Sequence, residues 1–258
     1  MIRYALLALC LVSPALAQDQ DDLVQADFLS GWQLPNGHYM AALDLRLAPD
    51  WKTYWRAPGE AGIPPTFDWA GSTNLKSVQF HWPKPQVIAL NGMKSIGYLN
   101  ELILPVEVVA QDPTQPVTLA LAMDLGICHD ICMPAHLTFA AALQGAGEKD
   151  SKIAAALADM PQQAKGATCK IEPITDGLRL QGDLKLPALG AEETVVFETN
   201  DPQVWVAEAQ TSRQGAVLSA TTDLVLPSGA PFTLDRSDVT ITVLAEGKAV
   251  EYNGCAAP

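Results

Sequence analysis

Residues 117–140 read VTLALAMDLGICHDICMPAHLTFA, and this stretch predicts a β-hairpin. An apolar run at 117–125 leads in, a second run at 137–140 leads out, and three residues separate Cys128 from Cys132 between them. A disulfide requires two cysteines whose Cα atoms lie close together, as they do at facing positions of a hairpin. The two cysteines are therefore placed to form a short disulfide at the tip.

The size of the ring that each possible bridge closes indicates its role. In the loop-closure model a five-residue ring stabilises the fold by about 2 kcal/mol, whereas joining Cys169 to Cys255 closes about 87 residues and stabilises by about 4.6 kcal/mol. The long bridge is typical of a structural disulfide. The short bridge gains little as a staple and lies within reach of an attacking thiolate, so we expect Cys128 and Cys132 to be redox-active. On spacing alone, a plain hairpin staple is the alternative.

The N-terminus has the layout of a secretory signal peptide. A single basic residue, Arg3, precedes an apolar run at 5–12, and small residues at Ala15 and Ala17 come before a polar stretch. We expect residues 1–17 to be the signal peptide, with cleavage after Ala17 and export into an oxidising compartment. Its removal leaves four of the five cysteines, an even number that suits two disulfides.

The composition argues against a nucleic-acid-binding protein and against a membrane-spanning one. The chain carries 16 basic and 29 acidic residues and lacks the clustered Lys and Arg that phosphate binding requires, so no nucleic-acid partner is expected. Beyond the signal peptide, no stretch approaches the roughly 20 consecutive apolar residues of a membrane-spanning helix. We therefore expect an exported protein that does not itself span the membrane.

Short strands separated by Pro, Gly and Asn recur along the chain. Residues 38–47 alternate apolar and polar side chains, which is typical of a half-buried strand, and similar short runs follow up to the hairpin. From residue 169 onward the β pattern returns. Several short strands at this spacing predict an all-β protein made of antiparallel β-sandwiches.

A change of composition near residue 145 divides the chain. There the pattern predicts a short helix that is capped by Asp150 or Ser151 and ended by a proline. We therefore expect a first β-sandwich domain at 18–145, a helical linker at 146–168 and a second β-sandwich domain at 169–258.

Metal binding is a second functional alternative for the hairpin. Cys128, His129, Cys132, Met133 and His136 place thiolates, a thioether and imidazoles within nine residues, and such soft ligands suit Cu(I) or zinc. Neighbouring residues of a hairpin alternate faces, so convergence of all five is not expected. A non-catalytic interaction domain is the third alternative, and no Gly-x-Ser-x-Gly elbow points to a hydrolase.

Four ordered motifs resemble a known family. The motifs are Trp51–Gly59, then Pro64–Trp69, then Lys94–Tyr98 leading into Leu102–Pro105, and finally Cys128–Pro134. Together they resemble the N-terminal periplasmic domain of DsbD-type thiol:disulfide interchange proteins, and the likeness is closest to the ScsB-like branch, which has a second β domain after the first.

The resemblance covers about residues 24–143 and implies an immunoglobulin-like sandwich with Cys128 and Cys132 as its redox pair. It implies a periplasmic component of a protein-disulfide reductase system, which serves processes such as cytochrome c biogenesis. Electrons come from a membrane-embedded partner and pass to periplasmic thioredoxin-fold proteins. One cysteine forms the mixed disulfide with a partner and the other resolves it, and we expect Cys128 to attack. No organic cofactor or metal is required.

Two features differ from the family pattern. The family has a cap loop that shields the cysteines, and by position it falls at Leu90, Asn91, Gly92 and Met93, where the aromatic and acidic residues of the better-known DsbD cap are absent. The family's membrane domain and thioredoxin domain are also absent from this sequence, so the resemblance is to a standalone form. We therefore expect a separate membrane-embedded protein to supply electrons.

Overall fold

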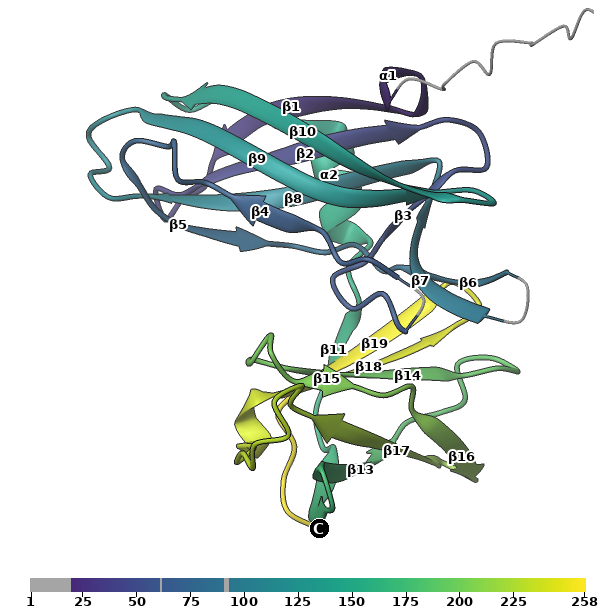
Figure 1. The fold of residues 1–258 in the computed structure, drawn as a ribbon. Coiled ribbons are helices and arrows are strands. Elements are labelled where there is room, and N and C mark those ends of the chain that lie inside the picture. Colours follow the sequence, from purple (N-terminus) through teal and green to yellow (C-terminus); the bar gives the residue numbers. More distant parts are fainter. Residues whose placement is uncertain (1–19, 61, 91–92) are drawn as a thin grey trace, which may run out of the picture.

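The computed structural model describes residues 20–60, 62–90 and 93–258. The predicted signal peptide, residues 1–17, lies outside the described residues. Two β-rich domains lie one above the other in Figure 1, and each has two sheets and its own apolar core. Both are immunoglobulin-like β-sandwiches, which confirms the predicted fold class. No helix in the described part of the chain has the length and apolar character needed to cross a bilayer.

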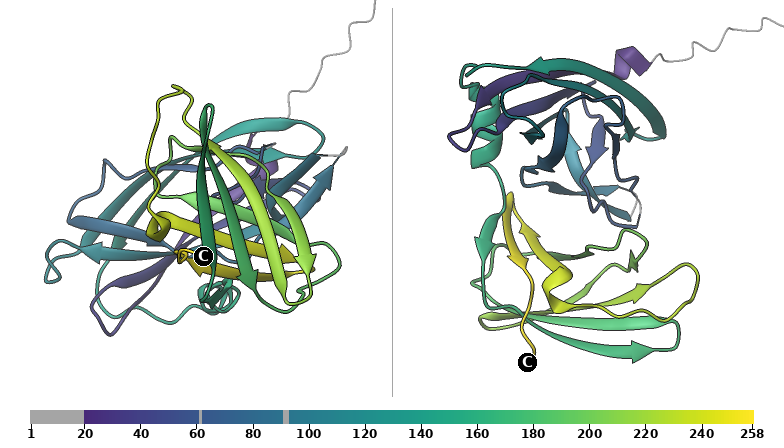
Figure 2. Two further views of the ribbon diagram at one scale, coloured as in Figure 1. Left: turned by 90° about the horizontal axis from the view of Figure 1, so that it is seen from below. Right: turned by 90° about the vertical axis from the view of Figure 1, so that its left-hand side faces the viewer.

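The first domain packs a four-stranded sheet against a six-stranded sheet (Figure 2). A short helix, α1 (Gln20–Leu23), precedes its first strand. In spatial order the smaller sheet contains β1 (Val24–Gln33), β2 (Tyr39–Leu47), β8 (Glu101–Ala110) and β5 (Leu75–Phe80). The larger sheet contains β10 (Cys132–Leu143), β9 (Val117–Cys128), β3 (Lys52–Tyr54), β7 (Met93–Leu99) and β6 (Gln86–Leu90), and β4 (Thr66–Asp68) also pairs with β9.

Strand β2 is buried on both faces, although its alternating sequence predicts burial of one face only. Leu43 lies in the core between the two sheets, whereas Met40 and Ala42 pack against Ile153 of helix α2 (Ser151–Ala158) on the outer face. The second face is buried because a helix from a distant part of the chain covers it.

Helix α2 is capped by Asp150, one of the two residues predicted for that role. Its carboxylate accepts hydrogen bonds from the backbone N–H groups of Lys152 (2.7 Å) and Ile153 (3.2 Å), which satisfies two of the donors that a helix N-terminus leaves free. The Lys152 ammonium in turn lies 2.8 Å from the buried carboxylate of Asp44 on β2. The helix of the predicted linker is thus packed onto the first domain.

The second domain pairs a four-stranded sheet with a five-stranded sheet. The first contains β11 (Gln162–Ala164), β19 (Lys248–Asn253), β18 (Val239–Ala245) and β14 (Thr194–Thr199), in that order. The second contains β12 (Thr168–Ile174), β13 (Gly177–Lys185), β17 (Val217–Val225) and β15 (Trp205–Val206), in that order. Strand β16 (Gln210–Gln214) also pairs with β17. A 3-10 turn at Arg236–Asp238 precedes β18. Strand β11 runs parallel to β19, so the end of the predicted linker becomes an edge strand of this domain.

A disulfide joins strand β12 of the second domain to the residues that follow β19. Cys169 of β12 is fully buried and is bonded to Cys255, which follows β19. The Cys169 N–H donates to the carbonyl oxygen of Ala256 (2.8 Å), and Arg236 Nε donates to the carbonyl oxygen of Cys169 (3.0 Å). The pairing expected from the spacing is therefore present, and it encloses every strand of this domain after β11.

Arg56 connects the two domains. It follows β3 in the first domain, and its guanidinium donates two hydrogen bonds to Glu198 of β14 (2.8 and 2.9 Å) and one to Glu251 of β19 (2.6 Å). The same guanidinium stacks 4.3 Å from the centre of the Trp55 ring. Bidentate pairing with a carboxylate and stacking on an aromatic face are both specific to arginine, so a lysine would not replace these contacts.

We predict that Arg56→Met lowers the free energy of unfolding by about 1–3 kcal/mol, because the mostly buried carboxylates of Glu198 and Glu251 lose their arginine donor. Urea denaturation followed by tryptophan fluorescence measures the loss. The control is Arg179→Met, which removes an equally bidentate pair with Asp223 on an exposed surface and is expected to cost less than about 1 kcal/mol. Equal losses would show that Arg56 makes only an ordinary surface ion pair.

Candidate functional site

The two cysteines of the hairpin are joined across the ends of β9 and β10. Cys128 and Cys132 occupy paired register positions, their Cα atoms are 4.1 Å apart, and their sulfurs are bonded. Their environments differ, because Cys128 is fully buried whereas Cys132 and the neighbouring Ile131 are exposed, Ile131 by 67%. A thiolate that approaches from solvent therefore meets Cys132 first.

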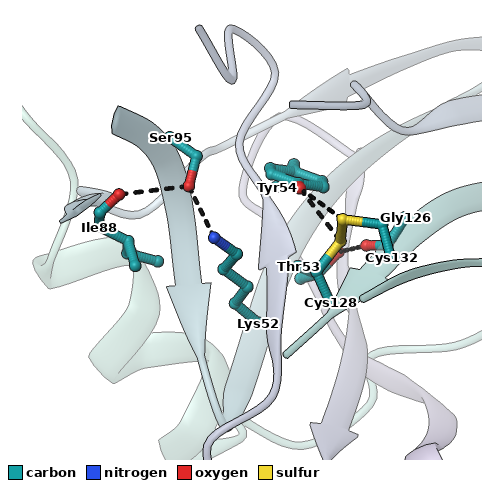
Figure 3. Close-up of a disulfide and its surroundings, with 8 residues drawn as sticks. All are labelled: Lys52, Thr53, Tyr54, Ile88, Ser95, Gly126, Cys128 and Cys132. Atoms are coloured by element: carbon teal, nitrogen blue, oxygen red, sulfur yellow. Dashed lines mark hydrogen bonds between the residues drawn. A yellow bond between two sulfur atoms is a disulfide. The ribbon is translucent and has the colours of Figure 1, made fainter. Parts of the chain in front are cut away.

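Strand β3 brings a tyrosine onto this disulfide (Figure 3). The strand lies between β9 and β7, with Lys52 paired to Cys128 and Tyr54 paired to Gly97. The buried Tyr54 places its Oη atom 3.0 Å from Cys128 Sγ and 3.3 Å from Cys132 Sγ. Disulfide sulfurs carry no proton, so the phenol is the donor in these contacts.

Glycines leave the space that the Tyr54 ring needs. A Cβ atom at Gly126 of β9 would lie 3.0 Å from Tyr54 Cε2 and 3.2 Å from Ile63 Cβ. A Cβ atom at Gly62, in the loop after β3, would lie 2.9 Å from Tyr54 Cδ1. The absence of side chains at these two positions lets the hairpin and the loop close on the ring and hold its hydroxyl against the sulfurs.

The tyrosine is suited to stabilise a thiolate. Burial raises the pKa of the Tyr54 phenol, so the hydroxyl keeps its proton at neutral pH. When the disulfide opens, a protonated phenol beside the sulfur donates a hydrogen bond to the thiolate that forms, and such a bond to the charged form lowers the pKa of the thiol. Tyr54 is therefore placed to make either sulfur a better leaving group.

Lys52 adds a buried ammonium group on the same face of β3. Its Nζ donates to Ser95 Oγ at 3.0 Å and lies 5.9 Å from the centre of the Tyr54 ring, and Ser95 donates in turn to the carbonyl oxygen of Ile88 (3.4 Å). Burial lowers the pKa of Lys52. The ammonium is therefore held beside the Tyr54 ring by its hydrogen bond to Ser95.

The remaining candidate metal ligands do not converge with the cysteines. His129 Nδ1 lies 3.2 Å from Asp130 Oδ2, His136 Nδ1 lies 2.6 Å from Asp124 Oδ1, and Met133 packs against the core of the first domain. Across the residues that the structure describes, no group of three or more His, Cys, Asp or Glu side chains is arranged to hold a metal ion. This arrangement gives the copper alternative no support.

The predicted cap loop falls where β6 ends and β7 begins. Leu90 ends β6 and Met93 begins β7 with 60% of its surface exposed, whereas Asn91 and Gly92 lie outside the described residues. Strand β3 lies between this hairpin and β9. In the described part of the chain the polar contact to the sulfurs comes from Tyr54, and shielding by residues 90–93 stays a prediction.

Comparisons with known proteins agree with the observed fold. Residues 20–143 match the family model described as thiol:disulfide interchange protein DsbD, N-terminal. Among solved structures, the N-terminal periplasmic domain of ScsB from Proteus mirabilis is similar, with a TM-score of 0.69 at 20% sequence identity, over 94% of this chain and 96% of that chain. No curated protein matches the sequence significantly.

The class of the first domain follows from these observations. Residues 20–143 form a β-sandwich with a disulfide pair at one end and match the DsbD N-terminal family model, so the likeness to that family covers the first domain. The likeness to the ScsB domain extends over both sandwiches, so the two-domain fold is shared.

The sequence pointed to the cysteines but not to the side chains around them. The aromatic residues at 51–56 indicate core packing by composition, and only the register of β3 shows that Tyr54 faces the sulfurs. The signal that could have identified Tyr54 is its place in the Trp51–Gly59 motif, directly before the proline- and glycine-rich loop.

We predict that Tyr54→Phe raises the pKa of the more reactive thiol in the reduced protein by about one to two units, because a hydrogen bond to a charged group is worth about 1.5–3 kcal/mol. Ultraviolet absorbance of the thiolate against pH measures the shift. Less thiolate is then present at neutral pH, so exchange with a small disulfide reagent becomes slower there. The control is Tyr98→Phe, since Tyr98 donates instead to the carbonyl oxygen of Pro83 (2.7 Å). An unchanged thiol pKa in Tyr54→Phe would show that the Tyr54 hydroxyl does not stabilise the thiolate.

Proposed function

We propose that this protein relays electrons by thiol–disulfide exchange at Cys128 and Cys132. The observation that carries the proposal is the asymmetric disulfide, in which an exposed Cys132 is bonded to a buried Cys128 and a buried phenol contacts both sulfurs. The match of residues 20–143 to the DsbD N-terminal model supports it, because that model is described as a thiol:disulfide interchange protein.

Reduction of the pair begins at the exposed sulfur. A thiolate of the donor attacks Cys132 Sγ, the Cys128–Cys132 bond breaks, and Cys128 leaves as a thiolate that accepts the Tyr54 hydrogen bond. The second thiolate of the donor then attacks the donor sulfur of the mixed disulfide and releases Cys132. The donor ends as a disulfide, and the pair has gained two electrons.

Oxidation of the pair reverses these steps with another protein. The Cys132 thiolate attacks the disulfide of an acceptor, and one acceptor sulfur leaves as a thiolate. The Cys128 thiolate then attacks Cys132 Sγ and releases the reduced acceptor. The exposure of Cys132 supports an intermolecular role for Cys132 and a resolving role for Cys128, whereas from the sequence we expect Cys128 to attack.

The partners follow from the compartment and from the family. We infer that the signal peptide at 1–17 directs the protein to the periplasm, that thioredoxin-fold proteins there are the acceptors, and that a separate membrane-embedded protein is the donor. The similar structure from ScsB is a periplasmic domain, which supports this location.

Trapping experiments test the assignment of the two sulfurs. We predict that Cys128→Ala, which leaves the exposed Cys132 as a free thiol, accumulates covalent complexes with periplasmic thioredoxin-fold proteins on non-reducing gels, and that Cys132→Ala accumulates far fewer because Cys128 is buried. Cys169→Ala is the control and should trap none. Complexes that form equally in all three variants would contradict a dedicated redox pair.

The two disulfides should also differ in stability toward reductants. We predict that the Cys128–Cys132 bridge has a reduction potential above about −300 mV and that the Cys169–Cys255 bridge lies below it, as is usual for exchanging and structural disulfides. Titration with dithiothreitol, alkylation and mass spectrometry of the cysteine peptides measure both. If the Cys128–Cys132 bridge resists reduction as strongly as the Cys169–Cys255 bridge, it is a structural disulfide and not a redox-active one.

A further inference from the structure

Strand β14 (Thr194–Thr199) is an edge strand whose outer side has no partner strand among the described residues. It pairs with β18 alone, at the end of the sheet order β11-β19-β18-β14. An edge strand presents unpaired N–H and C=O groups, which form a template for another extended chain. It contains no proline, and its charged residue, Glu198, is held by Arg56.

A cavity of about 770 Å³ runs along this edge, within the size range of ligand-binding sites. All six residues of β14 line it, and the opposite wall comes from the first domain, chiefly the loop after β3 and strand β7. Figure 1 shows that loop reaching down toward the second domain, where the Glu208 N–H donates to Glu60 Oε1 (3.3 Å). The cavity therefore needs both domains.

The lining combines an exposed aromatic ring with acidic side chains. Trp205, which is 50% exposed, lies among prolines of both domains, and tryptophan is among the residues most often found at the centre of protein interfaces. Of the charged residues that line the described cavity, Glu60, Glu198, Asp201 and Glu208 are acidic, whereas Arg56 and Lys94 are basic. Since Arg56 is engaged by Glu198, the exposed carboxylates at 60, 201 and 208 dominate the charge that an occupant meets.

We propose that an extended, basic segment of a partner protein binds here by adding to β14 as a new strand. Main-chain hydrogen bonds to the free edge provide affinity, and side chains that alternate along the segment provide specificity. Apolar side chains of the segment pack on Trp205, and its Lys or Arg side chains face Glu60, Asp201 and Glu208. Binding requires no free thiol, so it does not depend on the exchange proposed above.

The test pans a phage-displayed library of random linear peptides on the full-length, disulfide-bonded protein. We expect enrichment of peptides that carry Lys or Arg at alternate positions, and a loss of binding of at least about tenfold to Glu60→Gln/Asp201→Asn/Glu208→Gln and to Trp205→Ala. The amides keep the oxygens that accept the local hydrogen bonds of Glu60 and Asp201, so the triple variant should fold normally. Circular dichroism and thermal melting verify this.

A matched variant controls for net charge. Glu148→Gln/Asp176→Asn/Glu192→Gln removes three exposed carboxylates that do not line the cavity, and it should bind the selected peptides as the unmodified protein does. Equal losses in the two triple variants, or enrichment of peptides without basic residues, would overturn the proposal. An absence of any enrichment would overturn it as well.

Hydrogen exchange distinguishes strand addition from purely electrostatic binding to Glu60, Asp201 and Glu208. The selected peptide should slow exchange of the β14 backbone amides by at least about tenfold, without slowing exchange in β1, an edge strand of the first domain. Peptide binding that leaves β14 exchange unchanged would reject the edge as the site. Because none of these measurements involves Cys128 or Cys132, their failure would leave the redox function standing, and failure of the trapping experiment would leave this proposal standing.

Discussion

The short strand β3 determines how the exposed end of the first domain is built. It has three residues, yet it pairs with β7 along its whole length and with β9 at Cys128 and Ile127. The approach to β7 is so close that a Cβ atom at Gly97 would lie 2.1 Å from the Thr53 carbonyl oxygen. Side chains of a strand alternate between faces, so a slip of one residue in this pairing would turn Tyr54 away from the sulfurs. The contact between Tyr54 and the Cys128–Cys132 disulfide thus depends on the register in which β3 pairs with β7 and β9.

The features that could be predicted from the sequence are those that depend on neighbouring residues. The cysteine hairpin, the Asp150 cap and the recurrence of short strands are set by turn residues, capping groups and alternation within a few positions. The features that could not be predicted depend on pairing between distant segments. The second buried face of β2 depends on Ile153 of α2, and the position of Tyr54 depends on the register of β3.

The assignment of roles within the cysteine pair shows the same limit. Sequence spacing treats Cys128 and Cys132 alike, because each ends one arm of the hairpin. Their exposures differ because β9 lies inside the sheet and β10 lies at its edge. Cys128 ends β9 and pairs with Lys52 of β3 on its other side, whereas Cys132 begins β10. The difference in exposure between the two sulfurs therefore depends on a third strand that no local pattern places there.

The second domain also packs against the first. Leu244 and Ala249, from β18 and β19, belong to the apolar core cluster of the first domain, and Arg56 lies two residues after Tyr54. The loop after Arg56 contacts the Tyr54 ring through Gly62 and also lines the cavity beside β14. The same loop thus lies beside the ring that contacts the disulfide and forms part of the wall of the cavity. The residues that follow β3 therefore belong both to the surroundings of the disulfide and to the contact with the second sandwich.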